Sequence, residues 1–141
     1  MGSLEEYASN NFDNDARVAF WRRSVSMIGK LCQEHKRDLR IRAYTVLQGI
    51  ILGEQTLDSW EVWKDTFERV LFGLVVEPFV ITKEMLQGVG SDTRDYLRSE
   101  FEMSRERAVS LLCHCSLIRL PTLMQCPDFP VFWIRLIRLI V

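Results

Sequence analysis

The stretch Asp38-Leu-Arg-Ile-Arg-Ala-Tyr-Thr-Val-Leu-Gln-Gly-Ile50 decides the fold, because its pattern recurs later in the chain. The later copy is Arg105-Glu-Arg-Ala-Val-Ser-Leu-Leu-Cys-His-Cys115. Both copies begin with Arg-x-Arg-Ala and continue with apolar residues spaced by three and four, which is the spacing of one helix face. Recurrence of one helical pattern is typical of stacked helix-pair repeats, which bind other molecules far more often than they catalyse reactions.

The same apolar spacing predicts five helices, over residues 14–32, 38–53, 58–78, 103–118 and 129–140. Candidate N-caps are Asn14 or Asp15, Asp38, Asp58 and Ser104, and Gly53 is a candidate left-handed C-terminus. Residues 1–12 form a polar lead-in, in which Met1-Gly2-Ser3 is typical of a cloning remnant. Glycines and the lack of an apolar period predict a long flexible loop over residues 80–101.

No segment alternates with a period of two, so the predicted fold is all-α. We expect residues 13–141 to form stacked antiparallel helix pairs, which the family resemblance described below implies to be HEAT/armadillo-like. The first helix pairs with the second, the third pairs with the fourth across the loop, and the fifth begins a third pair. The chain stops inside the apolar run Trp133-Ile-Arg-Leu-Ile-Arg-Leu-Ile-Val141, so we expect a fragment of a longer solenoid.

Composition excludes several classes of function. The net charge of −1 argues against general nucleic-acid binding, which needs a surplus of basic residues facing phosphates. Three of the four cysteines lie within apolar helical patterns, as reduced thiols of an intracellular protein do. The polar N-terminus is unlike a signal peptide, and no apolar run is long enough for a membrane-spanning helix.

No motif predicts catalysis, a metal or a cofactor. Cys113-His-Cys115 resembles a metal-binding motif, but alternate positions of a helix point about 200° apart and cannot share one tetrahedral ion. Neither His35 nor His114 has a neighbouring carboxylate that would orient it as a catalytic base. Gly88-Val-Gly90 lacks the lysine of a phosphate-binding loop. We therefore predict no catalytic residues and no cofactor.

The arginines of the repeated motif have two interpretations. Asp38 and Arg42 fit repeat proteins in which an aspartate at the turn pairs with an arginine, and Arg107 would extend this as a structural ion-pair ladder. The alternative is that Arg42 and Arg107 bind a ligand. We favour the structural interpretation.

Three elements together resemble a known family. Their order is the one seen in large Arf guanine-nucleotide exchange factors. The first element is the segment 31–48, and the second is Trp60-Glu-Val-Trp-Lys-Asp-Thr-Phe-Glu-Arg-Val-Leu-Phe72. The third is Arg105–Leu112 followed by Phe129-x-x-Phe-Trp133. The chain is similar to a homology region downstream of their exchange domain, of the Golgi brefeldin-A-resistance type and most similar to the second such region. Gly73 stands where that family usually has proline, so the third helix should continue toward Pro78.

The resemblance implies a non-catalytic recruitment module in a protein that releases GDP from Arf. No residues match the exchange domain's loop with its glutamate finger. The implied partners are small GTPases, coat or tether proteins or other regions of the parent exchange factor, and the implied location is cytoplasmic, peripheral on Golgi membranes. The second helix of each pair should line the inner surface, which makes Arg40, Gln48 and Arg105 candidate partner contacts.

The last helix leaves two functions open. Trp133, Leu136, Ile137 and Ile140 would form an apolar face opposite Arg135 and Arg138, and such a helix can lie in a lipid surface. We favour the alternative that this face packs on the next repeat, and its exposure could drive self-association. A third alternative is a purely architectural or dimerisation spacer.

Overall fold

The computed structural model describes residues 4–53 and 57–141, and within these the side chains from residue 13 onward. The described residues form helices and connecting segments with no strand, which confirms the predicted all-α class. The elements are α1 (Leu4–Leu31), α2 (Arg37–Leu52), α3 (Trp60–Thr66), the π-helical turn η1 (Phe67–Leu71), α4 (Phe72–Val76), α5 (Lys83–Leu86), α6 (Ser91–Leu123) and α7 (Phe129–Ile140).

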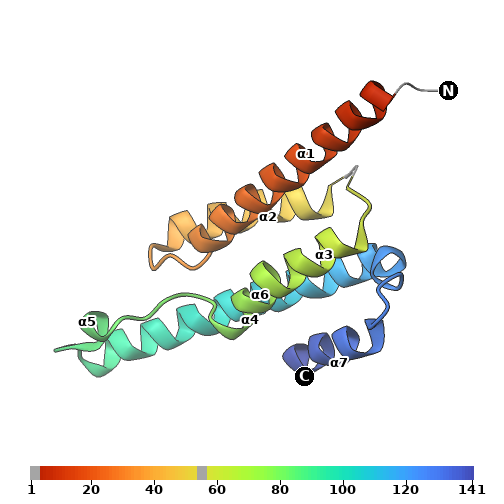
Figure 1. Ribbon diagram of the computed structural model, residues 1–141. Coiled ribbons are helices and arrows are strands. Elements are labelled where there is room, and N and C mark those ends of the chain that lie inside the picture. The colour runs from red at the N-terminus through yellow and green to blue at the C-terminus, as the bar shows by residue number, and fades with distance from the viewer. Residues whose placement is uncertain (1–3, 54–56) are drawn as a thin grey trace.

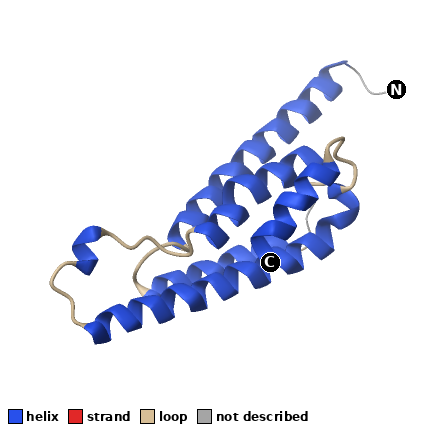
Figure 2. Ribbon diagram, turned by 90° about the horizontal axis from the view of Figure 1, so that it is seen from below, coloured by secondary structure: helices blue, strands red, loops and turns tan. Residues whose placement is uncertain are grey.

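The helices stack in three layers (Figure 1). The first layer is the hairpin of α1 and α2. In the second, α3, η1 and α4 run on as one helix that packs beside α6, and α7 begins the third layer against α4 and α6. The predicted arrangement of stacked antiparallel pairs is therefore confirmed. The segment that carries α5 extends away from the stack (Figure 2).

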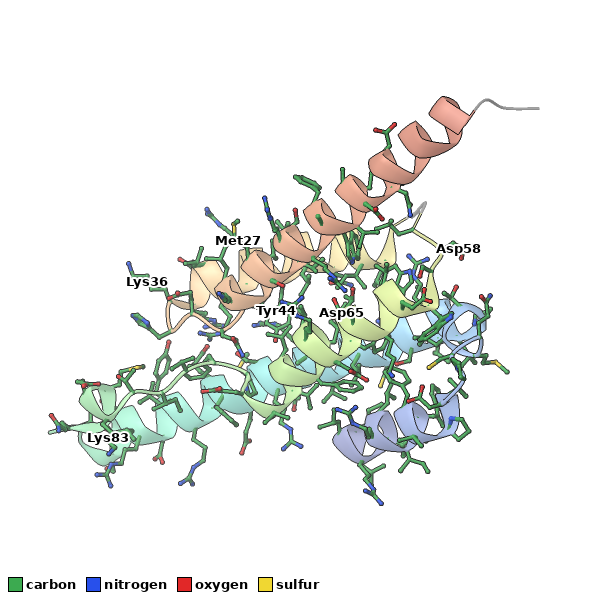
Figure 3. All side chains as sticks on the ribbon, in the orientation of Figure 1. Met27, Lys36, Tyr44, Asp58, Asp65 and Lys83 are labelled. Atoms are coloured by element: carbon green, nitrogen blue, oxygen red, sulfur yellow. The ribbon has the colours of Figure 1, made fainter. Side chains whose placement is uncertain are left out.

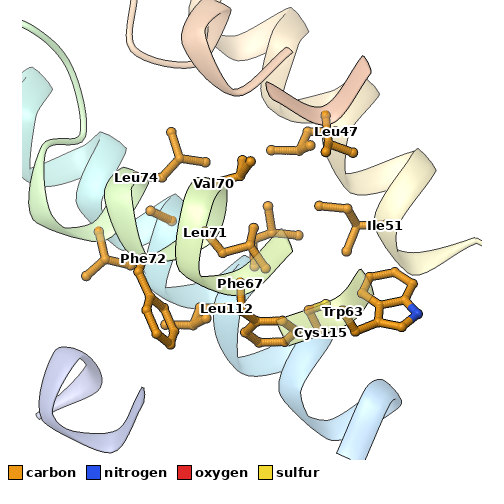
Figure 4. Packing of buried hydrophobic residues seen from close by; sticks show 14 of the residues in the cluster. Leu47, Ile51, Trp63, Phe67, Val70, Leu71, Phe72, Leu74, Leu112 and Cys115 are labelled. Atoms are coloured by element: carbon orange, nitrogen blue, oxygen red, sulfur yellow. The ribbon is translucent and has the colours of Figure 1, made fainter. Parts of the chain in front are cut away.

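One hydrophobic core runs through all three layers. Figure 4 shows its part between α2, the α3–η1–α4 helix and α6. The indole of Trp21 in α1 meets that of Trp63 in α3 edge-on, with 5.3 Å between ring centroids. The ring of Phe132 in α7 stacks on Phe72 with a centroid distance of 5.7 Å. Burial of these large side chains across layer boundaries is the main force that holds successive pairs together.

The predicted start of the first helix is wrong. The first helix begins at Leu4, so residues 4–12 are helical and Asn14 and Asp15 lie inside α1 rather than capping it. No proline or glycine interrupts residues 4–14, so the helix continues through a polar stretch. Residues 1–3, the expected cloning remnant, lie outside the described part of the chain.

The predicted loop over residues 80–101 is also wrong, because α6 begins at Ser91 and α5 forms before it. The face that the start of α6 buries is polar: Glu100 and Ser104 are among its buried residues. A search for apolar periodicity cannot detect a helix that buries a charged side chain. Ser104 is consequently a buried mid-helix residue and not a cap.

The remaining expected helix ends differ in detail. Lys36 and Ser59 occupy the N-cap positions, so Asp38 and Asp58 are not caps, and the Asp58 carboxylate accepts a hydrogen bond from the Thr122 hydroxyl at 3.3 Å. Gly53 follows α2 in an extended conformation, with φ −72° and ψ 173°, rather than a left-handed one. The third helix does run through Gly73 and ends at Val76, before Pro78, as the sequence predicts.

A buried arginine fixes one end of α2 against α6. The Arg40 guanidinium is fully buried and donates to the carboxylate of Glu100 in α6. It also donates to the carbonyl oxygens of Glu34, at 2.8 Å, and His35, at 3.2 Å, and it lies 4.7 Å from the ring centroid of Phe79. One side chain thus joins the α1–α2 turn, the segment after α4 and the second layer.

A second arginine fixes the opposite end of α2, reaching in the other direction. Arg119 of α6 donates to the carbonyl oxygens of Ile51 and Gly53, both at 3.0 Å, and stacks 4.3 Å from the ring centroid of Trp63. These carbonyls belong to the last turn of α2 and the residue after it, where no helical N–H is available to them. The Arg40 and Arg119 contacts together set the register of α2 on α6.

The Arg40–Glu100 pair predicts a large cost for removing one partner. Replacing Glu100→Gln leaves a buried guanidinium without a counter-charge, and we expect the free energy of unfolding to fall by about 3 kcal/mol. Urea unfolding followed by circular dichroism measures this change. Glu102→Gln, at an exposed position of the same helix, is the control and should change stability by less than about 0.5 kcal/mol. Equal effects of the two substitutions would refute the structural role of the pair.

Candidate functional site

The structure separates the three predicted partner contacts. Arg40 is fully buried, so its assignment as a surface contact is wrong. Gln48 and Arg105 are exposed and remain predictions. Arg105 follows Glu100 on α6 and so lies nearer the Arg40–Glu100 ion pair. Gln48 precedes Ile51 on α2 and so lies nearer the hydrogen bond from Arg119 to Ile51. The two side chains stand at different levels of the α2–α6 surface.

The predicted apolar face of α7 is mostly the face that packs on the protein. Leu136 is 1% exposed, and Trp133 and Ile140 are half-buried against the core, so only Ile137 of the four is exposed. Trp133 also stacks on Phe129, with 5.4 Å between ring centroids. The apolar residues of α7 that do face outward are Val131, Ile134 and Ile137.

The predicted ladder of Asp38, Arg42 and Arg107 is not formed among the described residues, and a different set of ion pairs forms a ladder elsewhere on the surface. No ion pair joins Asp38 to Arg42 among the described residues, and both side chains are exposed. The ladder instead links the first helices of successive layers. Its pairs are Arg22–Asp65 at 3.1 Å, Asp65–Arg69 at 3.7 Å, Lys64–Glu68 at 3.9 Å, Lys64–Asp128 at 3.3 Å and Glu68–Arg135 at 3.2 Å.

The electrostatics of this ladder are those of a solvated surface. The hydrogen bond with Asp128 raises the pKa of Lys64, while the Cys126 thiol and Lys64 lower the pKa of the Asp128 carboxyl by donating to it. Pairs of this kind contribute about 0–1 kcal/mol each and weaken with salt. They orient side chains along the surface more than they stabilise the stack.

The cysteines are spread through the molecule rather than gathered at a site. Cys115 is buried, Cys113 is half-buried and His114 is exposed. Among the described residues, no three His, Cys, Asp or Glu side chains form a group that could hold a metal ion. Burial raises the pKa of the Cys32 and Cys115 thiols to about 12.

Three neighbouring hollows lie along α1, and together we call them the α1–η1 furrow. The first two lie between α1 and the η1–α4 helix, and the third lies between the end of α1 and residues 80–85. Their volumes are about 520, 270 and 430 Å³. Ser26 and Arg69 line both the first and the second hollow, and Lys30 and Gln33 line both the second and the third. The furrow therefore follows α1 from Asp15 to the end of the helix at Leu31 and continues beyond Gln33.

Small residues form the floor of this furrow. Ala19, Ser26 and Gly29 come from α1, and Gly73 comes from the facing helix. A Cβ at Gly29 would lie 2.8 Å from Cγ1 of Val70, so this glycine is what allows the two helices to approach. A Cβ at Gly73 would have nothing within 4 Å, because it would enter open space.

Long basic side chains line the first two hollows of the furrow. They are Arg22, Arg23 and Lys30 from α1 and Arg69 from η1. Asp65, labelled in Figure 3, is paired with both Arg22 and Arg69. Arg23 and Lys30 have no ion-pair partner in the described part of the chain. The carboxylates Asp15 and Glu34 lie toward the two ends.

Sequence reasoning missed this furrow. A usable signal was present: Ala19, Arg22, Ser26, Gly29 and Gln33 are spaced by three and four on α1, which marks a face of small and polar residues. Gly73 was recognised as a departure from the family pattern, but its meaning depends on a facing helix that only the structure supplies.

A further hollow, of about 630 Å³ and mainly apolar, lies outside the furrow on the first layer. It is lined by α1, by Ile50 of α2 and by Leu57, and Phe20 on its rim is 74% exposed. No helix of the described residues is both long enough and apolar enough to cross a membrane.

Stacked antiparallel helix pairs with one continuous core define a helical-repeat protein. Residues 21–141 match the family model described as the GBF1-like tetratrico peptide repeat region, and the chain belongs to this family. The match supports the resemblance to a homology region of GBF1-like Arf exchange factors, and its description names tetratricopeptide rather than HEAT repeats. Neither the curated proteins nor the solved structures contain a match to the chain.

Two of the helical glycines, Gly29 and Gly49, predict opposite effects of one substitution. Gly29→Ala forces a methyl group against Val70, a stiff β-branched side chain, and we expect a loss of about 1 kcal/mol. Gly49→Ala meets nothing within 4 Å, so its better helix propensity should add about 0.5–1 kcal/mol. Urea unfolding of both variants tests the close approach of the helices, and a gain in stability at both positions would contradict it.

The buried thiols predict protection from alkylation. At about pH 8 we expect iodoacetamide to modify Cys113 first, and to reach Cys32 and Cys115 only when the protein unfolds. Mass spectrometry of the partly modified protein measures the order. Modification of Cys115 as fast as Cys113 in the folded protein would contradict the packing.

The same thiols predict the direction of a pH dependence. Their pKa is raised in the folded state, so the unfolded chain loses these protons first, from about pH 9. Their contribution to stability is complete below that pH and is lost as pH rises toward about 12. The free energy of unfolding, measured at increasing pH, should fall above about pH 9. The fall should be smaller in Cys115→Ala than in the unchanged chain.

Proposed function

We propose that this chain is a non-catalytic interaction and recruitment module of a large Golgi Arf exchange factor, corresponding to the second region downstream of the exchange domain. The observation that carries the proposal is the family match over residues 21–141 together with a single core spanning three layers. A rigid stack of this kind supplies an extended surface for a partner. Docking there would bring the distant exchange domain to Arf at the membrane.

A protein partner fits the surfaces better than a lipid bilayer does. On α7, Phe132 and Leu136 are committed to the core, and Arg135 is held by Glu68 and lies 5.6 Å from the ring centroid of Phe72. A lipid-binding helix needs its apolar face and its cations free together. On α7 only Arg138 and the three outward apolar residues, Val131, Ile134 and Ile137, would be available to a lipid surface.

Two measurements test the proposal. Added to Arf loaded with fluorescent GDP, the purified chain should leave the rate of GDP release unchanged, and acceleration would refute a non-catalytic role. Fused to a fluorescent protein in cells, it should concentrate on Golgi membranes. An even cytoplasmic distribution would refute recruitment by this region.

Vesicle flotation separates a protein partner from direct lipid binding. We expect the chain to remain with the protein fraction when mixed with phosphatidylcholine–phosphatidylserine vesicles. Flotation that is abolished by Ile134→Asp and Ile137→Asp, with helicity unchanged, would instead establish α7 as a membrane-binding helix. Both positions are exposed, so these substitutions leave the core intact.

A further inference from the structure

We propose that the α1–η1 furrow binds an extended acidic segment of a partner protein, with the acidic residues at the centre of the segment. This inference rests on the proposed role as an interaction module and identifies the surface and the chemistry of its partner.

Charge in the furrow is organised by position. Arg22, Arg23 and Arg69 line the first hollow, and Lys30 and Arg69 line the second, with the Asp65 carboxylate paired to Arg22 and Arg69. Asp15 lies at one end, and at the other Glu34 lies beside His35, with 3.9 Å between its carboxylate and the imidazole. An anion is therefore attracted most strongly to the stretch from Arg22 to Lys30, which lies between the carboxylates of Asp15 and Glu34 along the furrow.

The basic side chains retain capacity to bind. Arg22 and Arg69 share the single carboxylate of Asp65, and each guanidinium has five N–H donors. Their side chains are about half exposed, at 50% and 54%. Lys30 adds a charge with no ion-pair partner in the described residues. Carboxylates of a ligand could bind these donors in the forked geometry that arginine favours.

The shape of the furrow favours an extended chain. From Asp15 to Leu31, where α1 ends, it follows the helix for about 24 Å, which is the length of roughly seven extended residues. Small residues line it, and Gly73 borders open space in which a peptide backbone can lie between the basic side chains. A lipid surface is a poorer fit because the cations line a recess, and exposed Phe20 belongs to the other hollow.

The test uses the whole chain and two fluorescent octapeptides of identical composition, measured by anisotropy. One peptide has three glutamates at its centre and neutral ends, and the other has the same glutamates divided between its ends. We expect the central-acid peptide to bind at least tenfold more tightly, and binding to weaken as salt rises. Equal affinity for the two peptides, or no binding of either, would overturn the proposal.

Two pairs of variants place the binding in the furrow. A Cβ at Gly73 meets nothing within 4 Å, so Gly73→Met should fill the furrow and reduce affinity at least tenfold, while Gly49→Met, on α2 outside the furrow, should not. Lys30→Glu should weaken binding as strongly, and Arg138→Glu on α7 should not. Circular dichroism confirms that each variant is folded. If both furrow variants keep their affinity for the peptide, the assignment is overturned. Binding to phosphatidylserine vesicles that the central-acid peptide cannot displace would also overturn it.

Failure of this inference is distinguishable from failure of the proposed function. Golgi enrichment that persists in Gly73→Met and Lys30→Glu would leave the recruitment role standing and reject the furrow as its surface. Tight peptide binding by a chain that does not concentrate on the Golgi would leave the furrow standing as a binding site and reject the recruitment role.

Discussion

Two arginines that reach in opposite directions hold the first two layers of this protein in register. Arg40 extends from α2 to the carboxylate of Glu100 on α6, and Arg119 extends from α6 to the last carbonyls of α2. In a repeat protein each layer contacts only its neighbours, so hydrophobic packing alone would tolerate sliding of one pair on the next. Directional bonds at both ends of α2 remove that freedom. Each guanidinium also covers an aromatic ring, which keeps its charge out of water.

The opposite side of the stack is built differently. Between α1 and η1 the helices meet through small residues such as Gly29, and their charges form a solvated ladder of exposed or half-buried pairs. Such pairs exchange partners at little cost. The side fixed by buried arginines therefore supports a side whose basic residues are solvent-exposed and share few carboxylates, as the proposed ligand site requires. That combination suits docking, since the surface is preorganised and little order has to be gained on binding.

The sequence predicted the class of fold and the pairing of helices because these depend on apolar spacing, and it predicted the end of the third helix because Pro78 cannot continue one. Both signals are local. Sequence reasoning failed where polar residues are buried. The start of α6 was missed because Glu100 and Ser104 occupy its inner face, and Arg40 was assigned to the surface because buried arginines are rare. The repeated Arg-x-Arg-Ala motif shows the limit most clearly. Ala43 and Ala108 are equivalent and buried, whereas Arg40 is buried and Arg105 is exposed. The difference depends on Glu100, which no local pattern identifies as a partner.

Native-state hydrogen exchange measures most directly whether the two arginines make α2 and α6 one unit. If they do, the amides of α2 and of the facing part of α6 open together, with the same free energy and the same dependence on denaturant. If instead the amides of α1 and α2 exchange at a clearly lower free energy than those of α6, the first layer opens independently of the second and the arginine contacts do not hold the register.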